Sequence, residues 1–201
     1  MLIDLLRHGS TGRSGYLDGR TDPALTDEGW AQVSAQTRSR SWAAVVSSPL
    51  QRAEAVATAL TDGTRAPLRI DPDWAEYDFG DWDGLKRSEI EADPPGRTAL
   101  AAFYADPIRH PAPGGATWAS YETRVQRALL RVLSEAASPT LVITHAGPIR
   151  LALAFATGIE RNSLWALRVA YGTRIRLNAA IGANGKSWAE IVEIVQPESA
   201  P

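Results

Sequence analysis

Cysteine is absent from this sequence of 201 residues, and histidine occurs only three times. The lack of cysteine excludes disulfide bonds, thiolate metal sites and cysteine nucleophiles, and it gives no support to an oxidising compartment. No uncharged apolar run approaches the ~20 residues that a membrane span requires. The N-terminal segment has no basic leader of the kind found in signal peptides. These absences predict a soluble, cytoplasmic protein.

An excess of positive charge is also missing, since 21 lysines and arginines face 23 aspartates and glutamates and the formal net charge is -2. Such a surface is not expected to bind nucleic acid or membranes through bulk charge, so any anion site must be local. With 44% hydrophobic and 22% charged residues, the chain is long enough to bury one substantial core. A single domain over residues 1–201 is therefore expected.

Short apolar runs of strand length alternate with helical patterns along the chain. The runs cover residues 2–6, 43–46, 68–70 and 141–144. Thr26 is the expected N-cap of a helix to about residue 38, and Ser48-Pro49 is expected to open a helix to about residue 60. A third helix is expected to start at Gly147-Pro148 and to stop at Gly158. The alternation predicts a three-layer α/β/α fold with a mostly parallel central sheet.

Two regions depart from this alternation. Residues 173–180 and 188–195 have the pattern of strands, and the glycine-containing turn between them predicts a hairpin. Residues 85–115 are less regular, with a proline-glycine break at 94–96 followed by a short helix at 99–104. This pattern is typical of an insertion that lies over the sheet edge and caps the substrate.

Three of the predicted strands end in residues that suit an anion. The first ends in Arg7-His8, the second in Ser47-Ser48 with Arg52 one helical turn later, and the fourth in His145-Ala146-Gly147. The carboxyl ends of parallel strands meet at one edge of a sheet, and ligands bind there. The helices that follow would add backbone N–H groups, including that of Gly147, and positive dipole ends. The sequence therefore predicts a phosphate pocket at this edge.

The residue types at these strand ends suit phosphoryl transfer. Arginine pairs bidentately with tetrahedral oxyanions and stays charged, so Arg7 and Arg52 can hold a phosphate. A neutral histidine can attack phosphorus and a charged one can stabilise its oxygens, so His8 and His145 can divide these roles. The leaving oxygen needs a proton, for which we favour Glu76 as the donor. Three nearby carboxylates stay open as alternative donors: Asp78, Asp81 and Asp83.

Four motifs in this order carry a family resemblance. They are Leu6-Arg7-His8-Gly9, Ser47-Ser48-Pro49-Leu50-Gln51-Arg52-Ala53, the run 76–84 and Thr144-His145-Ala146-Gly147, with Gly19, Asp22, Leu25, Thr26 and Gly29 after the first. This arrangement resembles the histidine phosphatase superfamily, the phosphoglycerate mutase-like proteins. The resemblance implies a phosphoric monoester hydrolase of the histidine acid phosphatase type, with His8 as the phosphohistidine nucleophile and Glu76 as proton donor. It also implies a phosphate pocket of Arg7, Arg52 and His145, a small phosphate ester as substrate, and no metal or other cofactor.

Within this superfamily, residues 79–84, 113–115 and 144–150 look most like the α-ribazole-5′-phosphate phosphatases of cobalamin biosynthesis. The chain departs from the family pattern at Ser10, where glutamate usually stands, and at Ser14, where asparagine usually stands. Ala116 takes the place of a glutamate in the α-ribazole branch. The departure at Ser10 is expected to weaken a phosphate contact or its support, and Ala116 bears on the particular substrate.

Other assignments of substrate and function stay open. A broad-specificity phosphatase and a cofactor-dependent phosphoglycerate mutase need the same pocket, and an inactive module that binds a phosphorylated ligand or a protein is an alternative of another class. The candidates for contacts with the substrate or its cap are Gly19, Arg20, His110 and Trp82, and His110 can equally be a solvated residue. No two histidines share a close ligand spacing, which argues against a metal site. No apolar stripe marks an interface, so a homodimer is neither predicted nor excluded.

Overall fold

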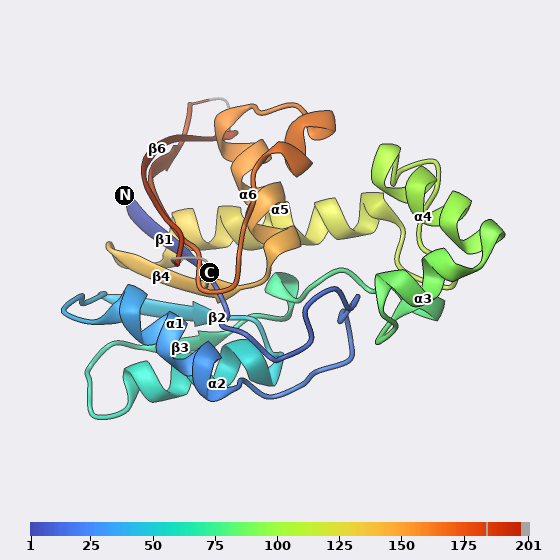
Figure 1. Ribbon diagram of the computed structural model, residues 1–201. Coiled ribbons are helices and arrows are strands. Elements are labelled where there is room, and N and C mark those ends of the chain that lie inside the picture. Colours follow the sequence, from blue (N-terminus) through green and yellow to red (C-terminus); the bar gives the residue numbers. More distant parts are fainter. Residues whose placement is uncertain (184, 198–201) are drawn as a thin grey trace.

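The computed structural model describes residues 1–183 and 185–197. Its centre is a six-stranded sheet in the order β3-β2-β4-β1-β5-β6, with helices on both faces (Figure 1). The strands are β1 Leu2–Arg7, β2 Ala44–Ser47, β3 Leu68–Ile70, β4 Thr140–Thr144, β5 Arg174–Ile181 and β6 Ser187–Val195. The first four pair in parallel, whereas β5 pairs antiparallel with β1 and with β6. The predicted α/β/α fold with a mostly parallel sheet is therefore confirmed, and so is the hairpin.

The helices lie between and around these strands. The α-helices are α1 Asp27–Thr37, α2 Gln51–Thr61, α3 Arg87–Ala92, α4 Pro94–Ala105, α5 Trp118–Glu135 and α6 Ala146–Thr157. The short 3-10 helices are η1 Pro72–Trp74, η2 Gly80–Trp82 and η3 Arg161–Ala166. Within the described part of the chain, no helix has the length and apolar character that would let it cross a membrane.

Capping residues explain where these helices begin and end. The Thr26 side chain accepts a hydrogen bond from the Gly29 N–H and caps α1, as predicted; a cap of this kind stabilises by about 1 kcal/mol. Helix α6 ends at Gly158, whose φ of 76° lies in the left-handed region that glycine tolerates. The prediction for α2 is wrong at its start, because Leu50 and not Ser48 holds the N-cap position. Ser48 is buried, and its hydroxyl contacts His145.

Three α-helices were misjudged or missed from the sequence, and α3 is one of those missed. Residues 94–96 do not break the chain but open α4, because Asp93 caps the helix and proline is tolerated in a first turn. The predicted short helix at 99–104 is therefore part of a longer one. Helix α5 was not identified, although Thr117 caps it and its buried residues recur every three or four positions. The apolar ones among these buried residues are Trp118, Tyr121, Val125, Ala128, Leu129 and Val132.

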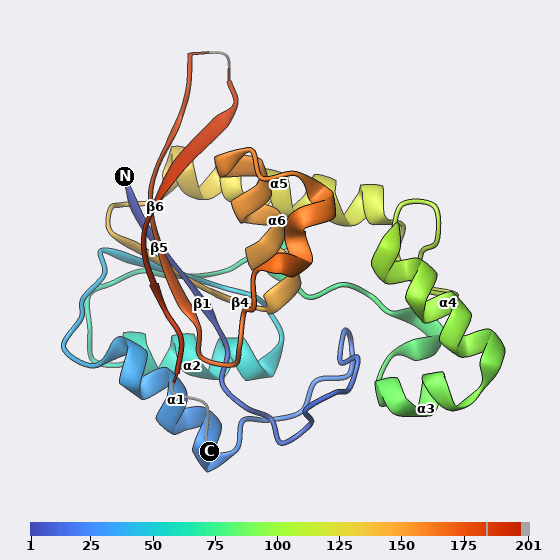
Figure 2. The ribbon, with the colours of Figure 1, turned by 45° about the horizontal axis from the view of Figure 1, so that its top comes forward.

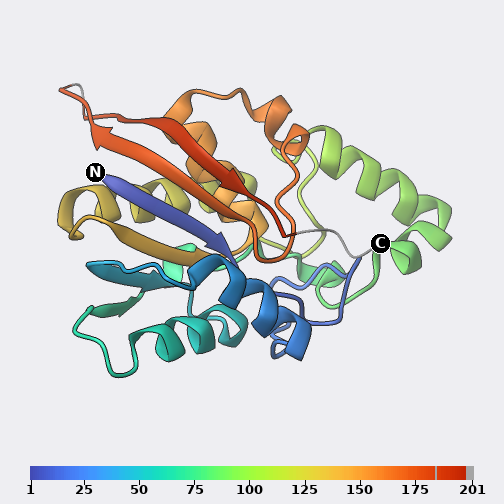
Figure 3. The same ribbon diagram turned by 60° about the vertical axis from the view of Figure 1, so that its left-hand side comes forward.

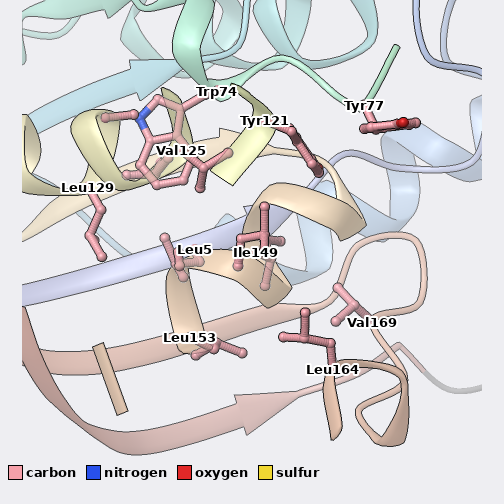
Figure 4. Close-up of a cluster of buried hydrophobic side chains, with 14 of the residues drawn as sticks. Leu5, Trp74, Tyr77, Tyr121, Val125, Leu129, Ile149, Leu153, Leu164 and Val169 are labelled. Carbon is pink, nitrogen blue, oxygen red and sulfur yellow. The ribbon is translucent and has the colours of Figure 1, made fainter. Parts of the chain in front are cut away.

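The two faces of the sheet carry separate cores. On one face, Leu6, Val45 and Ile143 of the strands pack against α1 and α2 (Figure 3). On the other face, β1 residues such as Leu5 pack against α5 and α6, together with the fully buried Trp74 (Figure 4). Strand β4 is buried along its whole length, which is what a central parallel strand covered on both faces requires. The cores fix the strands, and with them the position of the strand ends.

The insertion at 85–115 lies beyond the sheet, where α3 and α4 pack against each other (Figure 2). Helix α5 runs from this insertion back to the sheet (Figure 1). The aromatic side chains of Phe103, Tyr77 and Trp118 pack where the insertion meets the body of the protein. The insertion is therefore anchored by its own apolar core to the helix that covers the sheet.

Candidate active site

The carboxyl ends of β1, β2 and β4 meet as predicted. In the parallel register Arg7 pairs with Thr144, and Ser47 pairs with Ile143. The next residues in each chain segment are therefore brought together, and the rings of His8 and His145 lie edge to face with centroids 5.0 Å apart. A cavity of about 300 Å³ opens at this edge, within the size range of small-molecule sites. The predicted site residues that line it are Arg7, His8, Arg52, Glu76 and Gly147.

His8 is held in one orientation by its neighbour. Its Nδ1 lies 2.8 Å from the carbonyl oxygen of Gly9, and because a carbonyl can only accept, Nδ1 carries the hydrogen. The pKa of His8 is lowered well below its ordinary value of 6.5, first by burial and then by the charges of Arg7 and Arg52. Near neutral pH the ring is therefore neutral, with an unprotonated Nε2. This is the form in which a histidine acts as a nucleophile.

His145 contacts the second strand end. Its Nε2 lies 2.8 Å from the hydroxyl oxygen of Ser48, which in turn accepts a hydrogen bond from the Leu50 N–H. That hydroxyl can therefore donate to Nε2 and leave the hydrogen of the ring on Nδ1. The pKa of His145 is lowered well below 6.5 by burial, then by Arg52 and His8. Burial thus sets the charge of both histidines.

Two buried nitrogen atoms at this edge have no hydrogen-bond partner within the described ranges. They are Nδ1 of His145 and Nε of Arg7. A buried donor without an acceptor is costly, on the order of 1–3 kcal/mol each. Arg7 lines the cavity, so its free Nε suits an anionic ligand there, whereas His145 is fully buried beside His8 and is not among the lining residues. The rest of the Arg7 guanidinium is fixed, since Nη1 donates to the Val169 carbonyl at 2.7 Å and the group stacks 3.9 Å above the ring of Tyr171.

Arg52 has a double role in the geometry. It lines the cavity, and its Nη1 donates to Asp22 Oδ1 at 3.0 Å while Nη2 donates to the Asp18 carbonyl at 2.8 Å. Arg52 is buried, and the loop at residues 18–22 is held against it. The loop therefore depends on the same guanidinium that faces the cavity.

Glu76 presents its carboxylate to the cavity under the control of three donors. Oε1 accepts from the Tyr121 hydroxyl at 2.9 Å and from the Tyr77 N–H at 3.0 Å, and Oε2 lies 3.3 Å from the Gly147 N–H. Burial raises the pKa of Tyr121 well above 10.0, with a further contribution from Glu76, so this phenol stays a donor. The Gly147 N–H, predicted to face phosphate, is used to orient Glu76. A Cβ at position 147 would come within 2.3 Å of Oε1, so only glycine fits there.

The alternative donors lie outside the cavity. Asp78 pairs with Arg20 at 2.6 Å, the Asp83 carboxylate accepts backbone N–H groups of residues 19–21, and Asp81 is exposed. Within the segment 76–83, Glu76 is the carboxylate that lines the cavity. The geometry therefore favours the preferred donor over its alternatives.

The structure does not bring the other predicted contacts to the cavity. The Arg20 side chain is 80% exposed, His110 is exposed on the insertion, and Trp82 is buried against Phe103. Gly19 packs against the Tyr77 backbone, with no room for a Cβ. None of the four is among the residues that line the cavity. Their expected role at the substrate is not supported.

The residues that depart from the family pattern also lie away from the cavity lining. The backbone of Ser10 is buried in contacts with Gln32 and Thr26 at the start of α1. The Ala116 carbonyl accepts from the Tyr77 hydroxyl. Ser10 therefore holds the loop after β1 against α1 and is not itself among the residues that line the cavity.

Several cavity residues were not identified from the sequence. They include Arg87, Tyr104, Tyr121, Arg150, Trp165 and Tyr171. For Arg150 a signal existed, because it follows Gly147 by three residues on α6 and so shares its face. The others come from separate segments that no local pattern connects.

Comparison with known proteins identifies the family and the fold. A family model described as "Histidine phosphatase superfamily (branch 1)" matches residues 3–188. A bifunctional protein of Mycobacterium tuberculosis is 35% identical to this chain over 173 residues. The match covers 82% of this chain and 46% of that protein, so the chain spans about half the length of this relative. The adenosylcobalamin/α-ribazole phosphatase of Salmonella typhimurium is 27% identical over 86% of this chain and 87% of its own. The solved mycobacterial glucosyl-3-phosphoglycerate phosphatase with VO3 has a TM-score of 0.82 at 24% identity, covering 96% of this chain and 97% of that one, which shows a common fold.

Proposed function

Because the chain belongs to the histidine phosphatase superfamily, we propose that it hydrolyses small phosphate monoesters through a phosphohistidine formed on His8. The observation that carries this proposal is the state of His8, which is buried, neutral and held with Nε2 free beside Arg7 and Arg52. The unpartnered Nε of Arg7 supplies a donor for the phosphoryl oxygens. The proposal includes no metal and no cofactor.

The first step is transfer to the protein. The lone pair of His8 Nε2 attacks phosphorus, a P–N bond forms, and the P–O bond to the leaving group breaks. Glu76, in its protonated form, gives its proton to the leaving oxygen, which departs as an alcohol. Tyr121 and the Tyr77 N–H hold this carboxyl group in place.

The second step regenerates the protein. A water molecule attacks phosphorus and gives a proton to the Glu76 carboxylate, while the P–N bond breaks and inorganic phosphate is released. The same carboxyl group serves as acid and then as base, so one residue suffices for both steps. At the end Glu76 is again protonated and His8 is again neutral.

The particular ester is the finer part of the proposal. The resemblance of residues 79–84, 113–115 and 144–150 to the α-ribazole branch, together with the Salmonella relative, makes α-ribazole 5′-phosphate the first substrate to assay. Broad specificity and phosphoglycerate mutase activity are separate outcomes of that assay. A mutase would convert 3-phosphoglycerate, with its bisphosphate primer, to an isomer without releasing phosphate.

The chemistry itself is tested by trapping the phosphorylated protein. Protein quenched in alkaline detergent is expected to carry a labelled phosphoryl group that is stable to alkali, labile to acid and absent from H8A, and H8A is expected to lose at least about 10⁴-fold in kcat on p-nitrophenyl phosphate. H110A is the matched control, since it removes an exposed histidine outside the cavity, and it is expected to stay within about twofold of the wild type. Full activity of H8A would refute the proposal. Phosphate binding without turnover on any ester would favour an inactive binding module.

A further inference from the structure

One part of the cavity is lined by two arginine side chains that stack on two aromatic rings. The Arg87 guanidinium lies 4.6 Å from the centre of the Tyr104 ring, and that of Arg150 lies 5.2 Å from the centre of Trp165. The two rings meet edge to face at 5.1 Å. These four residues, which we call the arginine ladder, come from α3, α4, η3 and α6 and all line the cavity.

The two arginines of the ladder have no acidic partner. Among the described residues, no carboxylate lies within 4.0 Å of Arg87 or Arg150, whereas ten other arginines are paired in this way. Arg150 donates from Nε to the Leu167 carbonyl at 3.2 Å, and no hydrogen bond within the described ranges uses its two terminal nitrogens. Arg150 is half-buried and Arg87 is exposed, and guanidinium groups without an acidic partner are ready to bind an anion.

The acids that line the cavity, Asp18 and Glu76, form no ion pair with either arginine, although the charge of Glu76 acts on Arg150 from a longer distance. Asp18 is already bound through both oxygens to Arg13, at 2.9 and 3.0 Å, and Glu76 is oriented by its own three donors. The phosphoryl group is served by Arg7, Arg52 and the histidines. The cavity therefore has two positive charges more than a phosphate alone would use.

We propose that Arg87 and Arg150 bind a carboxylate on the leaving group, so that the preferred substrates are small phosphorylated carboxylic acids. This inference rests on the proposed function and narrows it. A cavity of about 300 Å³ suits a short acid better than a bulky second group. The neutral leaving group of α-ribazole 5′-phosphate would leave both guanidinium groups unused.

Stacking on the aromatic rings explains why these arginines suit the task. A guanidinium group that lies over a ring keeps its N–H edge free for a carboxylate, and the ring limits the conformations that the side chain must give up on binding. Trp165 and Tyr104 thus position the arginines without taking up their donors. The planar fork of arginine matches the two oxygens of a carboxylate.

The test uses two substrates that differ only at the proposed contact, D-3-phosphoglycerate and sn-glycerol 1-phosphate, in which a hydroxymethyl group replaces the carboxylate at the same C2 configuration. The wild type is expected to prefer 3-phosphoglycerate by at least about tenfold in kcat/KM. R150Q is expected to lower that ratio about tenfold, and R87Q, which changes a more exposed group, by about threefold. R109Q is the control, because the Arg109 side chain is 83% exposed on the insertion, and it is expected to keep the wild-type ratio.

Each outcome decides the inference. A wild-type ratio near one, an unchanged ratio in both R150Q and R87Q, or a preference for α-ribazole 5′-phosphate over 3-phosphoglycerate would overturn the subsite and leave the phosphatase proposal standing. Calorimetric binding of the same two esters to H8A measures the preference without turnover. Tighter binding of 3-phosphoglycerate to H8A, lost in H8A/R150Q, would support the subsite even if the wild type hydrolysed neither ester, a result that would refute the proposed function alone.

Discussion

The phosphate end and the leaving-group end of the cavity take their side chains from different kinds of segment. At the phosphate end, Arg7, His8 and His145 sit at the ends of adjacent strands, whose register fixes them to one another. At the leaving-group end, the arginine ladder comes from helices of the insertion, from η3 and from α6. A sheet edge holds reacting groups rigidly, whereas an insertion can change its surface without disturbing the sheet. The sheet edge therefore determines which reaction the site performs, and the insertion determines which ester it prefers.

Glu76 lies where the two ends of the cavity meet, in the proposed mechanism at the oxygen that links the phosphoryl group to the leaving group. Its replacement should therefore slow the hydrolysis of some esters more than that of others, depending on the leaving group. E76Q keeps the size of the side chain but removes the proton, and kcat is expected to fall about 10²- to 10⁴-fold on alkyl phosphates such as glycerol phosphate. p-Nitrophenolate leaves without a proton, so the loss on p-nitrophenyl phosphate is expected to be under about tenfold where the first step limits the rate. Steady-state and single-turnover rates on both esters measure this.

The control for this experiment is D81N, which changes an exposed carboxylate of the same segment outside the cavity. It is expected to keep both rates within about twofold. Equal losses on the two esters in E76Q would mean that Glu76 supports the phosphate end and is not the proton donor. A large loss in D81N with little loss in E76Q would transfer the role to the neighbouring aspartate.

The two ends also differ in how far the sequence predicts them. At the phosphate end each strand is a short apolar run with polar residues directly after it, so Arg7, His8 and His145 follow from strand prediction and the geometry of parallel sheets. The fold prediction also succeeded at the Thr26 cap and at the left-handed Gly158, whereas it missed the helix starts that Asp93 and Thr117 cap.

At the leaving-group end the prediction failed because its residues are neighbours only in three dimensions. Arg87, Tyr104 and Trp165 lie on separate segments, and no periodic pattern connects them. Treating residues 94–96 as a break also shortened α4, and without α5 nothing indicated what the insertion packs against. The position of Arg150 on α6, three residues after Gly147, was the one signal available before the structure.

A substitution at Tyr171 tests how Arg7 is held at the phosphate end, and its expected effect on activity is smaller than that of E76Q. Its ring lies 3.9 Å from the Arg7 guanidinium carbon and 5.5 Å from the His8 ring, while the Gly172 N–H donates to the His8 carbonyl at 3.0 Å. Loss of the ring in Y171L is expected to lower kcat/KM about 3- to 30-fold, the range of a desolvated cation–π contact. Because this contact serves the phosphate, the loss should be equal for 3-phosphoglycerate, glycerol phosphate and p-nitrophenyl phosphate.

Y171F is the control for this prediction, since it keeps the ring and removes only the hydroxyl, and it should stay within about twofold of the wild type. An ester-dependent loss in Y171L would assign Tyr171 to the leaving-group end. A loss in Y171F as large as in Y171L would mean that the hydroxyl, and not the stacked ring, is the important group.

A fall in pH is expected to lower the free energy of unfolding mainly through the two buried histidines at the phosphate end. His8 and His145 both have a pKa well below 6.5 in the folded state, mainly through burial. Below pH 6.5 their unfolded forms bind protons that the folded forms do not, so the unfolded state gains stability as pH falls. Their contribution is thus fully present above pH 6.5 and is lost progressively as the pH falls toward the folded-state pKa.

Urea unfolding between pH 8 and pH 5, without substrate, measures this contribution, whereas kinetics would mix it with titration of the ester, whose second pKa is near 6. The free energy of unfolding is expected to fall with pH in the wild type and to fall less steeply in H8A, which has one buried histidine fewer. H110A is the control variant, because its histidine is exposed on the insertion. A change of slope in H110A but not in H8A would mean that acid acts on the insertion, and the rigid end of the cavity would then be the less acid-sensitive one.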